Sequence, residues 1–324
     1  MDAILEIKNL AVEFRTKAGV VRAVDDVDLE ISDGEAVGIV GESGSGKSVT
    51  ALSILRLIKP PGKITCGSIK FKGEELLNAS EARIREIRGR HIAMIFQDPM
   101  TSLNPVYTVG EQIAEVIRLH RKLGRKEAWF KAVEALDEVA IPSPEKRAKD
   151  YPHQLSGGMR QRAMIAMALA CEPDLLIADE PTTALDVTIQ AQILELLSNL
   201  RKSRNLAMLL ITHDLGVVAE ATEKVFVMYT GRIVETAVSK DLYYDPKHPY
   251  TIGLFNSLPD TALKAGEKRR LQAIPGSIPV PINLPPGCHF YQRCQQRMDE
   301  CRTNPVPFYK ITESHQVRCF LYKN

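Results

Sequence analysis

Short apolar runs bounded by polar or glycine-containing segments recur along this chain of 324 residues. Four of them are Ala36–Val40, Leu175–Asp179, Ala207–Thr212 and Val225–Met228. Continuous apolar runs of this length are typical of strands buried on both faces of a parallel sheet. Segments with helical spacing, such as Val187–Lys202, separate them. This alternation predicts an α/β fold with a largely parallel core sheet and helices on its faces.

The beginning of the chain follows a different pattern. Leu5–Phe14 and Val20–Ile31 alternate weakly between apolar and polar positions, and each segment predicts a strand. We expect the second strand to be broken near Asp25 and Asp26, where two consecutive acids interrupt the alternation.

The middle of the chain changes to helical periodicity. Val109–Leu123, Lys126–Ala140 and Met159–Ala170 predict helices, and Ile141–Pro144 breaks the run between the last two. We therefore expect a helical subdomain at about residues 99–170, inserted into the α/β core.

Regular periodicity fades from about Pro246. Prolines then recur at positions 275, 279, 281, 285 and 286, and a cysteine-rich tail follows. This change predicts a main domain of residues 1–245 and a C-terminal extension of residues 246–324.

Composition and charge exclude several classes of function. Lys plus Arg number 42 and Asp plus Glu number 40, which argues against a protein that wraps nucleic acid with a basic face. No apolar run approaches the roughly 20 residues that span a bilayer. The first residues also lack the basic and apolar regions of a signal peptide. We expect a cytoplasmic chain whose membrane role, if it has one, comes through a partner.

A glycine-rich segment between a predicted strand and a predicted helix indicates a phosphate site. Gly41–Ser48 fits the pattern G-x-x-x-x-G-K-[ST] in full, and Ser48–Ile58 has helical spacing up to the Pro60-Pro61-Gly62 stop. Lys47 would reach the β- and γ-phosphates, and Ser48 would bind Mg²⁺. The alternative is a chance Gly/Ser-rich turn, which the strand and helix on either side disfavour. The other residues that we expect to line the nucleotide are Gly41, Ser43, Gly44, Ser45, Gly46 and Val49.

Two adjacent acids follow the apolar run that ends at position 179. Asp179 would hold Mg²⁺, mostly through water, and Glu180 would polarise the water that attacks the γ-phosphate. Alone, this pair could equally be a solvated turn at a strand end. Together with the Lys47 loop it is typical of an ATPase, because a phosphate-loop enzyme needs an acid to hold its metal.

Leu155–Met159 reads Leu-Ser-Gly-Gly-Met and is similar to the LSGGQ signature of the ABC ATPase family, with Met at the last place. Together with the phosphate loop and the two acids, this segment makes the sequence resemble that family. Independently of the resemblance, Ser156 and the two glycines Gly157 and Gly158 at a helix start predict a second anion site. One chain needs only one γ-phosphate cradle, so we expect this site to serve the ATP of another chain. The alternative is an ordinary helix cap formed by Ser156.

The resemblance implies further site residues. Gln97 matches the Q-loop glutamine, which contacts the γ-phosphate and Mg²⁺, and Asp186 matches the D-loop aspartate at the dimer interface. His213 matches the switch histidine, which would position Glu180 and the water. Phe14 matches the aromatic residue that stacks on adenine, although it could equally be a core residue of the first strand. The implied fold is a P-loop NTPase of the ABC cassette type with a mostly parallel core sheet, an antiparallel β subdomain, a helical subdomain and a Cys-rich C-terminal extension.

Within that family the chain is similar to the ATPase subunits of oligopeptide/dipeptide importers. The segments that carry this likeness are Gln97–Pro105, Tyr151–Leu155 and Lys247–Thr251. The likeness implies ATP hydrolysis that powers import of peptides or related small solutes. It also implies a second ATPase subunit, most often a different chain, two membrane permeases and an extracytoplasmic solute-binding protein. The expected location is peripheral, on the cytoplasmic face of the inner membrane.

Four of the six cysteines lie in the last 37 residues. Cys288, Cys294, Cys301 and Cys319 have the spacing C-x5-C-x6-C-x17-C, which differs from the tighter pairs of most zinc sites. The importer ATPases that this chain resembles carry a [4Fe–4S] cluster on such a quartet, and we favour it over the alternative Zn²⁺. Free thiols are a third alternative. The nearby ligand alternatives are His289 and His315.

Other kinds of ABC ATPase fit the sequence less well. Chromosome and DNA-repair members insert a long coiled coil before the signature, whereas here 108 positions separate Lys47 from Leu155 without sustained heptads. Translation-type members carry two cassettes, and this chain has one. A regulatory module without turnover would not need Glu180 and His213.

Overall fold

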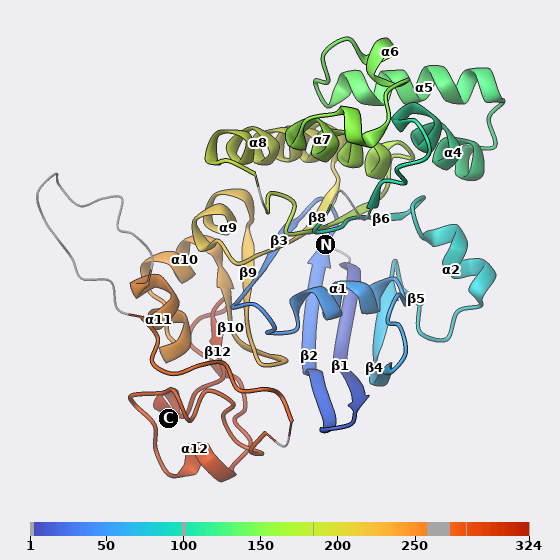
Figure 1. Ribbon diagram of the computed structural model, residues 1–324. Coiled ribbons are helices and arrows are strands. Elements are labelled where there is room, and N and C mark those ends of the chain that lie inside the picture. The colour runs from blue at the N-terminus through green and yellow to red at the C-terminus, as the bar shows by residue number, and fades with distance from the viewer. Residues whose placement is uncertain (1–2, 99–101, 184, 258–272, 283, 324) are drawn as a thin grey trace, which may run out of the picture.

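The computed structural model describes residues 3–98, 102–183, 185–257, 273–282 and 284–323. The N-terminal part forms an antiparallel sheet of four described strands in the order β2-β1-β4-β5. These strands are β1 (Ala3–Thr16), β2 (Gly19–Ser32), β4 (Gly62–Phe71) and β5 (Glu74–Glu75). This sheet is the antiparallel β subdomain that the sequence predicted, and Figure 1 shows it beside the core of the molecule.

A second sheet forms the core, with eight described strands in the order β11-β12-β10-β9-β3-β8-β7-β6. From β6 to β9 all neighbouring strands are parallel, and β10, β12 and β11 add an antiparallel edge. The strands are β3 (Ala36–Val40), β6 (Ile92–Ile95), β7 (Leu175–Asp179), β8 (Ala207–Thr212), β9 (Lys224–Tyr229), β10 (Arg232–Val238), β11 (Tyr309–Lys310) and β12 (Gln316–Val317). The predicted mostly parallel core sheet is confirmed.

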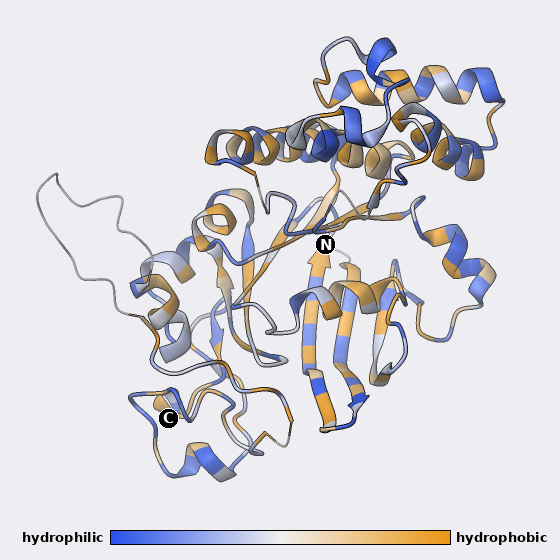
Figure 2. Cartoon of the chain, viewed as in Figure 1, coloured by the Kyte–Doolittle hydropathy of each residue, from blue (hydrophilic) through white to orange (hydrophobic). Residues whose placement is uncertain are grey.

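Alternating side chains of the core sheet enter two different hydrophobic cores. In β3, Ala36 and Val40 face one core, while Val37 and Ile39 face the other. The first core is covered by α4 (Val109–Arg121), α5 (Arg125–Glu138), α7 (Gly157–Leu169), α8 (Val187–Arg204) and α9 (Leu215–Ala221). The second is covered by α1 (Lys47–Ile54), α2 (Glu81–Ile87) and the antiparallel sheet. Figure 2 shows the resulting pattern, with apolar strands between helices that are polar on their outer faces.

The helices connect and flank the strands of both sheets. Their bounds are α1 (Lys47–Ile54), α2 (Glu81–Ile87), α4 (Val109–Arg121), α5 (Arg125–Glu138), α6 (Pro144–Arg147), η1 (Pro152–Gln154), α7 (Gly157–Leu169), α8 (Val187–Arg204), α9 (Leu215–Ala221), α10 (Ser239–Tyr244), α11 (Pro249–Asn256), α12 (Glu300–Thr303) and η2 (Phe320–Tyr322). Among the described helices, none combines the length and the apolar character needed to cross a bilayer.

Two local predictions were wrong. β2 runs through Asp25 and Asp26 without a break, although Asp26 takes a positive φ of 58° and the pairing with β1 shifts its register there. The interrupted alternation thus marks an irregularity inside the strand and not its end. α1 ends at Ile54 rather than at residue 58, since Arg56 adopts a φ of 52° that an α-helix does not tolerate. Apolar periodicity does not reveal this left-handed residue.

The C-terminal extension packs against the core. β12 pairs with β10 through Glu235 and Val317, so the tail adds strands to the core sheet. The proline-rich segment also meets the antiparallel sheet, where Val21 and Ile282 form an isolated bridge. The start of the predicted helical subdomain, at residues 99–101, lies outside the described residues.

Candidate functional site

The predicted phosphate loop lies between β3 and α1. The Cβ of any larger residue at Gly41 would lie 2.1 Å from the carbonyl oxygen of Met228, so the close approach requires glycine. Gly46 is the N-cap of α1 at a φ of 108°. Within the loop, Lys47 Nζ donates to the carbonyl oxygens of Gly41 and Glu42 at 2.7 and 3.0 Å. The loop thus holds the ammonium group at the end of a helix whose N–H groups are available to an anion.

Lys47 and Asp179 titrate abnormally because both are buried. Burial lowers the pKa of Lys47, against the raising effect of nearby Glu180 and Asp179. Burial also raises the pKa of Asp179, and the hydrogen bond from Ser48 opposes that shift. Ser48 Oγ donates to Asp179 Oδ1 at 3.0 Å. The Ser48 hydroxyl and the Asp179 carboxylate are therefore suitable oxygen ligands for Mg²⁺. The bound cation would also offset the cost of burying the carboxylate charge.

Glu180 is the centre of a polar cluster beside this pair. Its Oε2 accepts hydrogen bonds from Gln97 Nε2 at 3.0 Å and from Thr183 Oγ1 at 2.8 Å. Its Oε1 lies 3.4 Å from His213 Nδ1. Burial raises the pKa of Glu180, but the hydrogen bonds with Thr183 and His213 lower it by more. The net shift of the pKa is therefore downward. Glu180 also takes a φ of 48°, a conformation that costs free energy and recurs at functional sites.

Phe14 and Val49 lie at the edges of this region. Phe14 pairs with Val21 on β2, and its ring covers Gly62. The same strand β2 supports the phosphate loop, since the carbonyl oxygen of its Ala23 lies against Gly46. Val49 is in the first turn of α1. An adenine-stacking role for Phe14 therefore stays a prediction.

The predicted signature segment forms the start of α7. Ser156 is the N-cap, and its hydroxyl accepts from the Met159 N–H at 3.3 Å. Gly157 lies near the side chain of Leu185, and a Cβ at Gly158 would meet Ile189 at 3.1 Å. The signature thus lies beside the predicted D-loop. Ala184, which lies within that D-loop, is outside the described residues. Asp186 is described, and its side chain caps α8 by accepting from the Ile189 N–H.

The two predicted anion cradles lie on opposite faces of the core sheet. Ala51 and Ile54 of α1 belong to one hydrophobic core, whereas Met164 and Ile165 of α7 belong to the other. Ser156 is also exposed. The geometry therefore separates the signature from the loop that Lys47 completes.

The four C-terminal cysteines converge on one small cavity. Cys288, Cys294, Cys301 and Cys319 all line it, and none of them forms a disulfide. Among the described residues, however, no three His, Cys, Asp or Glu side chains form a group that could hold a metal ion. Burial raises the pKa of Cys288 to about 12 and that of Cys319 to about 11, so these thiols are neutral at physiological pH.

The two histidines considered as alternative ligands are engaged elsewhere. His289 Nδ1 donates to the carbonyl oxygen of Thr230 at 2.9 Å, and His315 Nε2 lies 2.7 Å from Glu235 Oε1. Neither histidine lines the cysteine cavity.

Sequence reasoning missed several residues that contact the site. Thr183, Tyr250 and Arg293 reach Glu180 or the phosphate loop, yet none of them was assigned a role at the site from the sequence. Tyr250 lies in the Lys247–Thr251 segment, which indicated only the likeness to importer ATPases. Thr183 lies three residues after Glu180, and its polar character there was the one available signal. Tyr250 and Arg293 are 209 and 252 positions after Gly41, so only the fold reveals their contacts.

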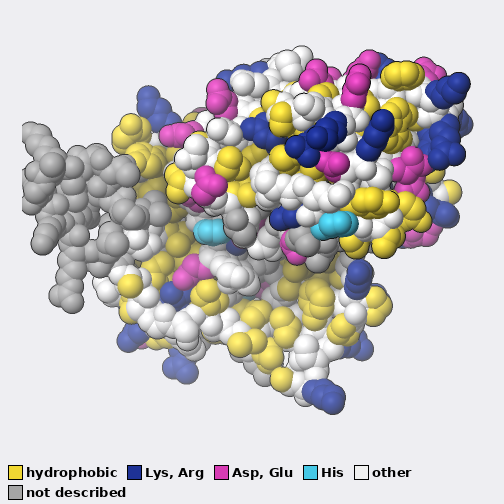
Figure 3. Space-filling model, turned by 45° about the horizontal axis from the view of Figure 1, so that its top comes forward, with side chains coloured by type: hydrophobic (Ala, Val, Ile, Leu, Met, Phe, Trp, Pro, Cys, Tyr) yellow, Lys and Arg dark blue, Asp and Glu magenta, His cyan; other side chains and the backbone are white. Residues whose placement is uncertain are grey.

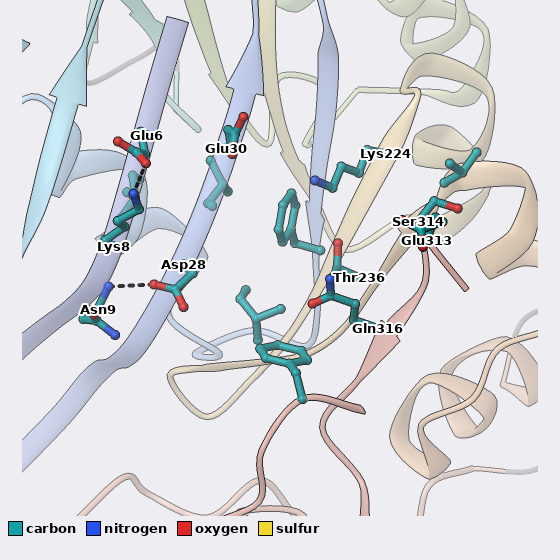
Figure 4. A pocket seen from close by; sticks show the side chains of 16 residues that line it. Glu6, Lys8, Asn9, Asp28, Glu30, Lys224, Thr236, Glu313, Ser314 and Gln316 are labelled. Atoms are coloured by element: carbon teal, nitrogen blue, oxygen red, sulfur yellow. Dashed lines mark hydrogen bonds and ion pairs between the residues drawn. The ribbon is translucent and has the colours of Figure 1, made fainter. Parts of the chain in front are cut away.

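A separate groove of about 570 Å³ opens between the antiparallel sheet, β9, β10 and the tail. Figure 4 shows its polar side chains, among which Lys8 pairs with Glu6 and the Asn9 N–H donates to Asp28. None of the residues predicted to contact ATP lines this groove.

Comparisons with known proteins agree with the geometry. The ABC transporter family model matches residues 24–183, and a model described as the oligopeptide/dipeptide transporter C-terminal region matches residues 234–301. The chain is 54% identical over 324 residues to the oligopeptide transport ATP-binding protein AppD of Bacillus subtilis strain 168, covering 100% of this chain and 98% of that protein. It is 52% identical over 329 residues to a putative peptide import ATP-binding protein of Brucella ovis, covering 99% and 97% of the two chains.

A solved structure shows the same fold. It is the dimeric ATP-binding cassette MJ0796 in a post-hydrolysis state bound to ADP and Pi, with a TM-score of 0.66 and 28% identity over 72% of this chain and 98% of that chain. The predicted cassette fold is confirmed. From its nearly full-length likeness to these relatives, the chain belongs to the ATP-binding subunits of the ABC transporter family, within the oligopeptide/dipeptide group.

Proposed function

We propose that this chain hydrolyses ATP to power an importer of dipeptides, oligopeptides or related small solutes. The observation that carries the proposal is the cluster around Glu180, in which Gln97, Thr183 and His213 all reach the carboxylate that follows the Asp179 strand. A carboxylate held by three partners beside a phosphate loop is suited to orient water for attack on a γ-phosphate. The relatives named for peptide transport support the substrate class.

Each residue of the cluster has a distinct part in the proposed reaction. Lys47 and the loop N–H groups bind the phosphates, while Ser48 and Asp179 hold Mg²⁺. The metal, when bound, neutralises charge on the phosphate oxygens. Glu180 orients the attacking water, because an ionised carboxylate accepts the water's hydrogen bond, and the lowered pKa keeps it ionised further into the acid range.

The complete site requires two chains. Ser156, Gly157 and Gly158 would bind the γ-phosphate of an ATP held by the partner's phosphate loop, in a head-to-tail dimer. The separation of α1 and α7 across the core sheet supports this arrangement. The exposed position of Val187, 83% accessible next to Asp186, supports a second chain on this surface. We propose that the second chain is a paralogous ATPase.

The proposed membrane partners are two permease subunits, served by an extracytoplasmic solute-binding protein. Exposed apolar side chains support such a contact: Phe96, which precedes Gln97, and Val106 and Tyr107 later in the sequence. In Figure 3 apolar side chains are interspersed with charged ones over the helical layer. The location would be peripheral, on the cytoplasmic face of the inner membrane.

We also propose that residues 1–245 form the cassette and residues 246–324 an accessory extension with a [4Fe–4S] cluster. Convergence of four thiols on one cavity supports this donor set, because four cysteines are the usual ligands of such clusters. The cysteine side chains would have to reorient to reach ligand distances. Zn²⁺ is the alternative occupant. Iron and acid-labile sulfide at four per chain would support the cluster, and one zinc without iron would exclude it.

Transport measurements test the main proposal. Vesicles that contain the chain with its permeases and paralogue should take up peptide when ATP is present and should lose uptake with Glu180→Gln, because the amide cannot polarise water. The Glu180→Gln chain should still bind ATP. The exposed Glu220→Gln provides a control with the same chemical change on α9, outside the cluster. Unaltered uptake by the Glu180→Gln complex would refute the role of Glu180, and ATP hydrolysis without transport of any peptide would refute the substrate class.

A further inference from the structure

The segment that lines the cysteine cavity also contacts the phosphate loop. Arg293, next to Cys294, has a side chain that is only 6% exposed. Its guanidinium donates to both carboxylate oxygens of Glu42, at 2.8 and 3.2 Å, and its Nε donates to the carbonyl oxygen of Pro275 at 3.0 Å. Glu42 is the second residue of the phosphate loop. A bidentate pair of this kind fixes the direction as well as the distance between its partners.

A second contact reaches the backbone of the same residue. The N–H of Glu42 donates to the hydroxyl of Tyr250, on α11, at 2.9 Å. Tyr250 is fully buried and packs against Tyr229 and Phe290. The side chain and the main chain of Glu42 are therefore both held by residues from beyond position 245.

A third contact reaches the middle of the loop through the β9–β10 turn. His289 Nδ1 donates to the carbonyl oxygen of Thr230, and the adjacent Gly231 N–H donates to the carbonyl oxygen of Ser45 at 2.8 Å. Two positions of the loop, Glu42 and Ser45, are thus connected to the segment 288–294. This connection does not pass through Asp179, Glu180 or Gln97.

Movement of Glu42 would affect nucleotide binding directly. The carbonyl oxygens of Gly41 and Glu42 are two acceptors of the Lys47 ammonium group. If Glu42 loses its side-chain partner, only the Tyr250 contact still holds its backbone, so these carbonyls can shift and the lysine is less firmly aimed along the loop. An unpaired carboxylate at this place also adds negative charge near the phosphates.

We propose that Arg293 is a positioning residue for nucleotide binding, which holds the phosphate loop in its binding conformation through Glu42. The C-terminal extension then helps to hold the ATP site in its binding conformation. This inference rests on the proposed function, because it assumes that the Gly41–Ser48 loop binds ATP.

Nucleotide affinity of the full-length chain tests the role of Arg293. Arg293→Ala should weaken MgATP binding about tenfold, which corresponds to about 1.4 kcal/mol, measured by calorimetry on variants that carry Glu180→Gln to prevent turnover. Arg293→Lys, which retains the charge but not the bidentate geometry, should recover part of the affinity. Arg302→Ala is the matched control, since Arg302 belongs to the same extension but is exposed. It should bind MgATP as the parent does.

A double-variant cycle separates positioning from a general loss of stability. Glu42→Ala should weaken binding by a similar factor, and the double variant Glu42→Ala/Arg293→Ala should be no weaker than the worse single variant, because both act through one pair. If Arg293→Ala does not fold, the comparison of Glu42→Ala with Glu42→Gln provides the same test, since only the amide retains an acceptor for Arg293.

The outcomes distinguish this inference from the proposed function. Absence of MgATP binding to the parent chain would refute the proposed function itself. Binding by the parent, loss with Lys47→Ala and unchanged affinity with Arg293→Ala would overturn only the role of Arg293. Additive effects in the double variant would likewise overturn it, because independent effects do not pass through a shared pair.

Discussion

Two helix starts in this molecule have the same chemistry but different surroundings. The phosphate loop before α1 is enclosed, with Lys47 buried and held by carbonyl oxygens and with Ser48 bonded to Asp179. The signature before α7 is open, and among the described contacts the Ser156 hydroxyl bonds only to the Met159 N–H of its own helix. Both present backbone N–H groups to an anion.

The difference indicates where each half of an ATP site is completed. An enclosed loop that includes its own cation and metal ligands can bind a nucleotide within one chain. An exposed cap on the opposite face of the core sheet from that loop receives an anion only from outside the chain. The contrast therefore predicts that loop variants change binding to the isolated chain, whereas signature variants change only the assembled pair.

The largest effect is expected at the enclosed site. Lys47→Ala should weaken MgATP binding by the isolated chain about 100-fold, because it removes a buried charge-assisted contact worth roughly 3 kcal/mol. Fluorescence titration with a labelled ATP analogue measures this loss. Lys59→Ala, an exposed lysine after α1, is the control and should have no effect. If the two variants bound equally well, Lys47 would not be a phosphate ligand.

A smaller and conditional effect is expected at the open site. Ser156→Ala should leave ATP affinity of the isolated chain unchanged and should lower hydrolysis by the assembled pair about tenfold, since it removes one hydroxyl from the partner's γ-phosphate. Steady-state phosphate release from the reconstituted complex measures this difference.

Thr108→Ala provides the matched control for the signature. Thr108 caps α4 as Ser156 caps α7, each accepting from an N–H three residues later at 3.3 Å. Both substitutions should reduce the free energy of unfolding by about 1 kcal/mol, as loss of an N-cap does. Only Ser156→Ala should reduce hydrolysis. Equal losses of hydrolysis in both variants would mean that Ser156 is a cap and nothing more.

How well the sequence predicted each region depends on how far apart in the sequence its contacting residues lie. The bounds of β3, β7 and β8 were predicted from short apolar runs, because strands buried on both faces leave a continuous signal. The end of α1 before Arg56 was not, since a single left-handed residue changes the chain direction without changing the apolar pattern. Contacts of Glu42 with Arg293 also left no local signal, because they join positions 251 residues apart.

Thr183, a site residue that the sequence did not assign, provides the smallest testable effect. Thr183 donates to Glu180 and, with His213, lowers its pKa against the raising effect of burial. Thr183→Val should therefore raise the pKa of Glu180. Because a lowered pKa keeps the carboxylate ionised as pH falls, the variant should lose activity at a higher pH than the parent.

The sign and size of this shift can be checked in one profile. At neutral pH, parent and variant should have the same rate within a few-fold, since Glu180 is ionised in both. As pH decreases toward the ordinary carboxylate range near 4.5, the variant should fall first, and the stability that Glu180 contributes in its ionised form should fall with it. A kcat profile from pH 8 down to below the ordinary carboxylate value of 4.5, with Thr182→Val as the neighbouring control, measures the displacement. An acid limb at the same pH in Thr183→Val and the parent would show that the hydroxyl does not tune Glu180, and the lowered pKa would then be due to His213 and Lys47.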